Sequence, residues 1–151
     1  MTTNTRRLLS AVFWLYLLLM LWLLFGQRLG SRTVWSYSDQ LRLNLNLTPF
    51  ATIARYLRFL SEQEGRLLTH AIVNLAGNIV MFIPLGALLP CRFPQLRKFP
   101  LQLLCCAALI AAVELVQLFT LLGSCDVDDL LLNLMGTSLG WLLFLPVRSI
   151  V

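Results

Sequence analysis

Four long apolar stretches constrain this chain more than any other feature of its sequence. The first, from Leu8 to Phe25, contains no charged residue, no glycine and no proline, and it is apolar on every side. A helix needs about 20 such residues to cross the hydrocarbon core of a bilayer. The spans that we predict cover residues 8–26, 67–90, 101–122 and 130–147. The sequence therefore predicts an all-α membrane protein, folded as a four-helix transmembrane bundle.

The composition agrees with this fold class. Hydrophobic residues make up 58% of the chain and charged residues 13%, against about 45–50% and 25% in soluble domains. These values exclude a water-soluble enzyme and a disordered chain. The net charge is +5, but the basic residues are scattered among apolar runs, so we expect no nucleic-acid partner. Four spans leave about 70 residues for loops, which predicts one integral membrane domain over residues 1–151.

The long connection between the first two spans is expected to lie outside the membrane. Its alternating run from Leu41 to Leu47 predicts an extended segment, because a period of two is typical of strands. Thr48 is the expected N-cap of a short helix, with Pro49 at the first helical position. Apolar residues recur on one face of this helix, and Arg55 and Arg58 point elsewhere. We predict an interfacial amphipathic helix whose arginines contact lipid phosphates.

The distribution of charge favours an orientation with both chain ends in the cytoplasm. Basic residues are equally numerous on the two sides, but three of them lie within the ten residues that join the second and third spans. Clusters of Lys and Arg beside span ends are typical of cytoplasmic loops. Six of the seven acidic residues would then lie outside. We expect a multi-pass protein in a lipid bilayer, with cytoplasmic N- and C-termini.

Polar side chains inside the spans are the strongest functional signal. An ionisable residue at bilayer depth costs about 2.5–3.5 kcal/mol and is therefore a candidate site by default, as is Glu114 in the third span. Amide and acidic residues also share helix faces in the second and fourth spans. The short link between the last two spans should bring Glu114 within reach of Asn133 more readily than of Asp126. The ligand-binding residues that we predict are Asn74, Asn78, Glu114, Gln117, Asp126, Asp129 and Asn133.

Proline and glycine are expected to shape the helices around these residues. Pro84 frees the carbonyl of Val80 from its helical hydrogen bond, which predicts a kink. Gly136 and Gly140 have the spacing of close helix contacts. The same surface could also contact a second copy of the chain in a homo-oligomer. The residues with an expected structural role are Pro49, Gly77, Pro84, Gly86, Gly136 and Gly140.

The remaining residues with metal or redox chemistry indicate no cofactor. The four cysteines lack the Cys-x-x-Cys spacing, so neither a disulfide framework nor a zinc site is expected. An Asp-x-Asp-Asp pattern over residues 126–129 is by itself a weak signal for a divalent ion, and we predict no metal site. The three acids are more typical of a solvated turn and a helix cap.

Three blocks of this sequence resemble the VanZ-like family of bacterial membrane proteins. They are Asn46–Phe50, Asn74–Gly86, and Glu114–Gln117 followed by Asp126–Gly136. The resemblance implies a bacterial inner-membrane protein of the cell envelope and a link to resistance to the glycopeptide teicoplanin. The family pattern usually has an arginine shortly before the acidic cluster, where this chain has Ser124. An arginine of the long connection, such as Arg55 or Arg58, could take its place.

The residues leave three functions open. In the first, the protein binds or modifies a lipid-linked envelope precursor through an outward-facing pocket. If it is an enzyme, Glu114 or Asp129 is the candidate general acid or base, although no nucleophile with an adjacent base is recognisable. In the second, it is a small transporter with Glu114 as the proton or cation site. In the third, it is a non-catalytic assembly protein whose polar residues bind only one another.

Overall fold

The computed structural model describes residues 2–26, 35–62 and 65–149, and nearly all of them are helical. Four helices are long and apolar enough to cross a membrane, which confirms the all-α membrane fold. Their boundaries differ by only a few residues from the predicted spans. They are α1 (Thr3–Phe25), α4 (Gly65–Arg92), α5 (Phe99–Thr120) and α6 (Val127–Phe144), the last extended by the 3-10 turn η3 (Leu145–Val147).

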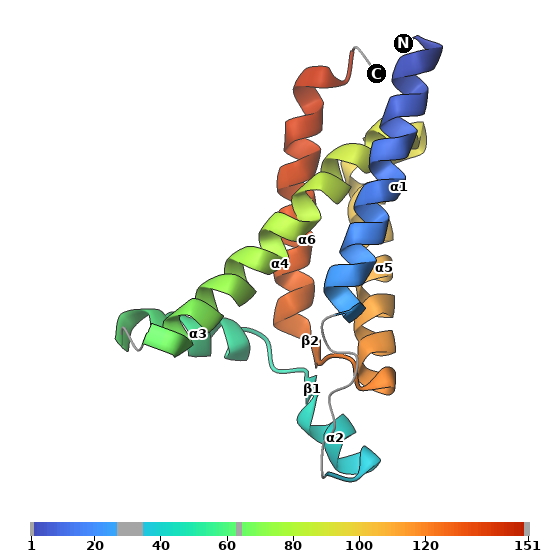
Figure 1. Cartoon of the computed structure of the whole chain (residues 1–151). Helices are drawn as coiled ribbons and strands as arrows, with labels where there is room; N and C mark the ends of the chain where they lie inside the picture. The colour runs from blue at the N-terminus through green and yellow to red at the C-terminus, as the bar shows by residue number, and fades with distance from the viewer. Residues whose placement is uncertain (1, 27–34, 63–64, 150–151) are drawn as a thin grey trace.

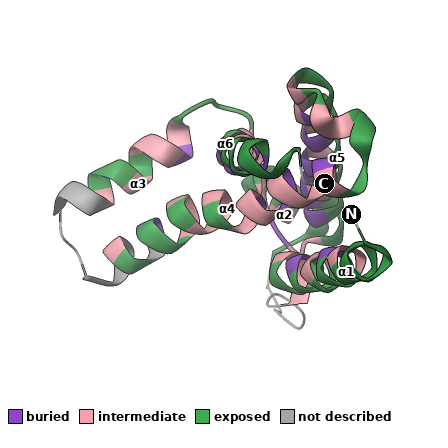
Figure 2. Cartoon of the chain, turned by 90° about the horizontal axis from the view of Figure 1, so that it is seen from above, coloured by how far each residue is buried: buried purple, intermediate pink, exposed green. Residues whose placement is uncertain are grey.

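The long helices place both chain termini at one end of the molecule (Figure 1). The short turn η2 (Pro94–Arg97) joins α4 to α5 at this end. The link between α5 and α6 lies at the opposite end, next to α2 (Tyr37–Leu43). Helix α4 crosses the bundle diagonally, and its first half runs beside α3 (Ala51–Glu62), away from the other helices (Figure 2). The predicted short helix between the first two spans is therefore present as α3.

The tightest packing in the bundle is between α4 and α6. A methyl group on Gly136 would overlap the carbonyl of Ile79, and one on Gly140 would overlap the carbonyl of Ile83. A methyl group on Gly86 would meet the α6 backbone in the same way. The small-residue spacing thus serves a helix contact within the chain. Pro84 lies inside α4, which continues across it as one helix.

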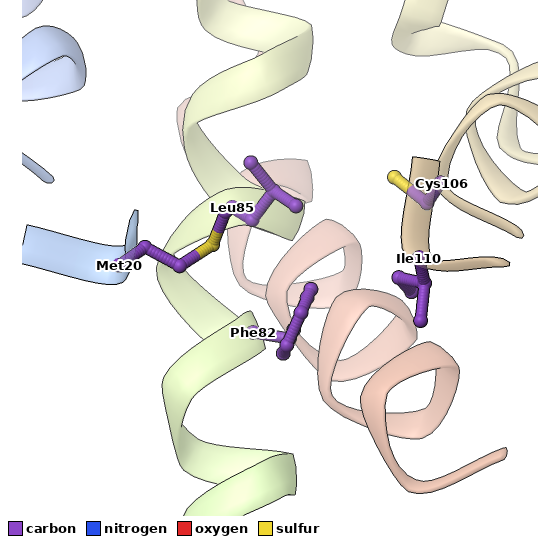
Figure 3. Close-up of a cluster of buried hydrophobic side chains, with 5 residues drawn as sticks. All are labelled: Met20, Phe82, Leu85, Cys106 and Ile110. Carbon is purple, nitrogen blue, oxygen red and sulfur yellow. The ribbon is translucent and has the colours of Figure 1, made fainter. Parts of the chain in front are cut away.

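A compact apolar cluster joins three of the four long helices. It consists of Met20 from α1, Phe82 and Leu85 from α4, and Cys106 and Ile110 from α5 (Figure 3). Its side chains are at most 4% exposed, in contrast to the outward-facing leucines of the same helices. This cluster and the α4–α6 contact hold the polar groups described below in fixed positions.

Two predictions for the long connection are wrong. The run before Leu45 is not extended, because Ser36 caps the helix α2 and accepts a hydrogen bond from the backbone of Asp39. Only β1 (Leu45–Asn46) is extended, and it pairs in parallel with β2 (Cys125–Asp126). Thr48 is not the N-cap of α3, nor is Pro49 its first residue: the helix begins at Ala51, after Phe50 turns the chain with a φ of 63°.

Candidate functional site

The candidate site lies where the α5–α6 link folds back against the bundle. Helix α5 ends at Thr120, and Leu121 then adopts a left-handed conformation with a φ of 56° that reverses the chain. The link runs back along α5 toward its middle, and the backbone N–H of Asp126 donates to the Glu114 carboxylate at 3.2 Å. We expected Glu114 to reach Asn133 more readily than Asp126, and this expectation is therefore wrong. The turn at Leu121, rather than helix length alone, sets the depth of the link.

The carboxylate of Asp126 connects this link to the long loop. It accepts hydrogen bonds from the Thr52 hydroxyl at 2.6 Å and from the Asn46 amide at 3.1 Å. Asn46 also donates to Thr52 at 2.9 Å. The parallel pairing of β1 with β2 brings Asn46 opposite Asp126. Asp126 is thus buried in a network that joins α3 to the start of α6.

Asp128 is a structural residue that sequence reasoning did not recognise. Its side chain is fully buried, although the pattern is typical of a solvated turn. The carboxylate accepts hydrogen bonds from the backbone N–H groups of Phe50, Thr52 and Ile53, at 2.8 Å for Thr52 and 3.0 Å for Ile53. It caps α3 in place of Thr48, satisfying donors that a helix leaves unpaired at its start. No local pattern signals a cap that comes from about 75 residues away in the sequence.

Six of the seven predicted ligand-binding residues line one pocket of about 300 Å³ between the four long helices. Apolar side chains of α1 and α4 also line it, among them Leu24 and Met81. The seventh residue, Asp126, lines an adjoining pocket of about 240 Å³ that shares Asn74, Ser124 and Asp129 with the first. The six residues in the larger pocket are Asn74, Asn78, Glu114, Gln117, Asp129 and Asn133.

Some of these polar groups are bound to the protein itself. The Asn78 amide donates to the Asp129 carboxylate at 2.6 Å, which joins α4 to α6. The Gln117 amide donates to the carbonyl of Leu24 at 2.9 Å, which joins α5 to the end of α1. These two contacts between helices are of the kind expected for an assembly protein whose polar residues bind only one another. They also define the walls of the pocket.

Asn133 differs from its neighbours in the pocket. It is 2% exposed, and its Oδ1 accepts no hydrogen bond from any residue that the structure describes. A buried acceptor without a donor costs about 1–3 kcal/mol, so such a group in a pocket favours a ligand that supplies the donor. Glu114, which is 6% exposed, lies in the same pocket. The pocket therefore presents oxygen acceptors and fits a ligand that carries hydrogen-bond donors.

The smaller pocket brings positive charge to the acidic cluster. Arg55 of α3 lines it together with Asp126 and Asp129. An arginine of the long connection thus lies near the position where Ser124 replaces an arginine of the family pattern. Burial raises the pKa of the neighbouring Cys125 thiol, and the charges of Glu114 and Asp126 raise it further. Among the described residues, no group of three His, Cys, Asp or Glu side chains is placed to hold a metal ion.

Four membrane-length helices around a polar pocket define a multi-pass membrane protein. The family model VanZ/LLP1 matches residues 13–149, and the chain belongs to this family. Over 131 residues it is 27% identical to Protein VanZ of Enterococcus faecium, a match that covers 86% of this chain and 69% of that protein. No solved structure matches the chain.

Proposed function

We propose that this protein binds a membrane-associated ligand of the cell envelope in the pocket between α1, α4, α5 and α6. The observation that carries the proposal is Asn133, a buried residue that lines this pocket and whose Oδ1 accepts no hydrogen bond from the described residues. Most buried polar groups in folded proteins have a hydrogen-bond partner, so an amide oxygen without one beside a pocket supports a ligand that supplies the donor. The pocket, rather than any single residue, is the functional unit.

The lining of the pocket indicates the chemistry of the ligand. Its polar side offers amide and carboxylate oxygens, which bind hydroxyl or ammonium groups. Its apolar side, including Leu23 and Val73, suits a hydrocarbon chain. A lipid-linked envelope precursor with amino or hydroxyl groups has both parts. Membership of the VanZ/LLP1 family supports an envelope role, and we extend this to teicoplanin resistance as part of the proposal.

The location follows from charge and from the position of the pocket. The basic connection between α4 and α5 lies at the end that holds both termini, and the acidic pocket lies at the other end. Because basic loops prefer the cytoplasm, we propose that the pocket opens at the outer face of the bacterial inner membrane. A ligand in the outer leaflet could enter it without crossing the bilayer.

Gly77 offers a way to fill the pocket without disturbing the core. It lines the pocket, and a Cβ added there meets no atom within 4 Å. Gly77→Leu should therefore block the ligand while the bundle stays folded. Ala76→Leu is the matched control, because Ala76 is the preceding residue of α4, is exposed and does not line the pocket.

We would measure two properties of the full chain with each substitution. The first is the teicoplanin concentration that inhibits a susceptible bacterium expressing the protein. The second is binding of the lipid-linked peptidoglycan precursor to the purified protein in detergent, by native mass spectrometry. Gly77→Leu should abolish both teicoplanin resistance and binding of the precursor, and Ala76→Leu should preserve both. The proposal fails if the Gly77→Leu protein has the same unfolding temperature as the wild type and retains both resistance and binding.

The buried carboxyl of Glu114 favours the transporter as a second candidate. Glu114→Gln separates the two, because it keeps the shape and the acceptor for Asp126 N–H but removes ionisation. Ligand binding should persist in this variant, whereas proton or cation flux through proteoliposomes should be lost. Flux in the wild-type protein that Glu114→Gln abolishes would establish the transporter instead.

A further inference from the structure

A larger pocket lies at the opposite end of the molecule from the acidic site. Its volume is about 480 Å³, and it lies between the start of α1, the end of α4 and the turn η2. Both chain termini are at this end (Figure 1). Four arginines line it: Arg6, Arg7, Arg92 and Arg97.

The distribution of Asp and Glu leaves these arginines without nearby acidic side chains among the described residues. All seven Asp and Glu residues fall within residues 39–64 and 114–129. The described ones lie in the loop helices or at the acidic end of the bundle, far from η2 (Figure 1). None of the four guanidinium groups pairs with a carboxylate of any residue that the structure describes. Four like charges around one cavity repel one another, and an anion between them would relieve this repulsion.

Two of the guanidinium groups are held in place by neutral partners. Arg97 Nε donates to the carbonyl of Pro90 at 3.3 Å, and its guanidinium carbon lies 5.9 Å from the centre of the Phe144 ring. Arg92 lies 5.3 Å from the centre of the Phe93 ring. Such contacts fix an arginine without neutralising it. The side chains are therefore partly ordered before an anion arrives, which lowers the entropic cost of binding.

We propose that this pocket binds a phosphate group. Arginine forms paired, charge-assisted hydrogen bonds with phosphate oxygens, and several arginines converging on a cavity suit an anion with more than two oxygens. The hydroxyls of Thr3 and Ser10 add donors, and Leu9 and Leu88 provide an apolar wall. The pocket lies at the ends of two membrane-length helices, where we expect lipid headgroups. The phosphate belongs to an anionic phospholipid or to a soluble phosphate ester.

The test is native mass spectrometry of the full chain in a neutral detergent, titrated with three probes. Phosphatidylglycerol carries the phosphate on a lipid, glycerol phosphate carries it in solution, and diacylglycerol is the same lipid without it. The test variant is Arg6→Gln with Arg92→Gln, two exposed arginines that line the pocket. The control is Lys98→Gln with Arg148→Gln, which removes equal charge from exposed residues at the same end but outside the pocket.

We expect one phosphate-bearing probe per chain and no retention of diacylglycerol. The pocket variant should bind at least about tenfold more weakly, as loss of charge-assisted hydrogen bonds predicts, and the control within about twofold of wild type. Binding of phosphatidylglycerol alone assigns the pocket to a headgroup, and equal binding of glycerol phosphate assigns it to a soluble ester. Equal weakening by both variants, no weakening by either, or retention of diacylglycerol would overturn the proposal. The acidic pocket is left intact throughout, so its proposed function is tested separately.

Discussion

Asp128 is a buried carboxylate that joins two helices at the acidic end. It bridges the first turn of α6 and the first turn of α3 through three backbone N–H groups. Because the carboxylate is fully buried, water cannot replace it when it is removed. Asp126 binds the side chain of Thr52 in α3, and Asp129 binds the side chain of Asn78 in α4. Asp126 and Asp128 thus share Thr52 as a partner, through its hydroxyl and its backbone N–H, whereas Asp129 binds α4.

Asp128→Asn should loosen α3 from the bundle. The substitution removes the charge and points an amide NH₂ toward backbone donors, so we expect a loss of about 2–3 kcal/mol in the free energy of unfolding. Thermal unfolding in detergent measures this loss, and limited proteolysis should show new cleavage near residues 48–50. Gln95→Asn, at an exposed position with no side-chain hydrogen bond among the described residues, is the control and should stay within about 0.5 kcal/mol. Equal stability of the two variants would contradict the capping role.

Cys125 should react slowly with alkylating reagents at neutral pH. Burial and the nearby negative charges raise its pKa, which lowers the fraction of reactive thiolate at any pH below that pKa. Its rate of alkylation should therefore keep rising above pH ~8.5, where an ordinary thiol is half ionised. Mass spectrometry of the alkylated peptide measures the rate, with Cys125→Ser protein giving the background. A rate that is already at half of its maximum at that pH would show an unperturbed thiol.

At the scale of elements, the α4–α6 contact depends on the absence of side chains. Gly140→Ala should destabilise the protein by about 1–3 kcal/mol, because the added methyl overlaps the Ile83 carbonyl and the backbones must separate. Gly77→Ala, also in a long helix, meets no neighbour and should be neutral or stabilising by up to about 1 kcal/mol. Thermal unfolding of both variants in the same detergent checks the contrast. Similar losses in the two variants would mean that the overlap with the Ile83 carbonyl does not explain the requirement for glycine at position 140.

The long helices were predictable because each carries its signal locally. Apolar residues on all sides define α1 and α5 whatever they pack against. The short elements were not, because their ends are set by distant groups. The alternating leucines before Asn46 favoured an extended segment, yet the Ser36 cap starts a helix there. The start of α3 depends on Asp128, which belongs to another helix.

At the scale of the whole molecule, orientation links the two pockets to the two membrane faces. We predict that the end with η2 is cytoplasmic and that α2 lies outside. In a background where the native cysteines are serines, Ser38→Cys should react with an impermeant maleimide on intact cells. Asn4→Cys should react only after permeabilisation. Both positions are exposed and described. The reverse pattern would place the acidic pocket at the cytoplasmic face.

The sequence predicted which residues line the candidate site but not how they contact one another. Polar residues are so costly in lipid that their presence in three spans already indicated a shared interior, and six of them do line one pocket. Their pairing was not accessible. The reversal at Leu121 decides that Glu114 accepts from Asp126 N–H, and the strand pair decides that Asn46 reaches the same link. Such contacts depend on how the helices are arranged, which no local pattern encodes.

By itself, the sequence determined that this chain is a bundle of four membrane helices with polar groups turned inward. Lipid cannot hydrogen-bond to the backbone or solvate a carboxyl, so apolar length and misplaced polar residues leave few alternatives. Only the tertiary structure decided which acid caps a helix, which amide remains without a partner among the described residues, and that arginines from α1, α4 and η2 surround one cavity. These features arise from residues far apart in the chain, and packing alone brings them together.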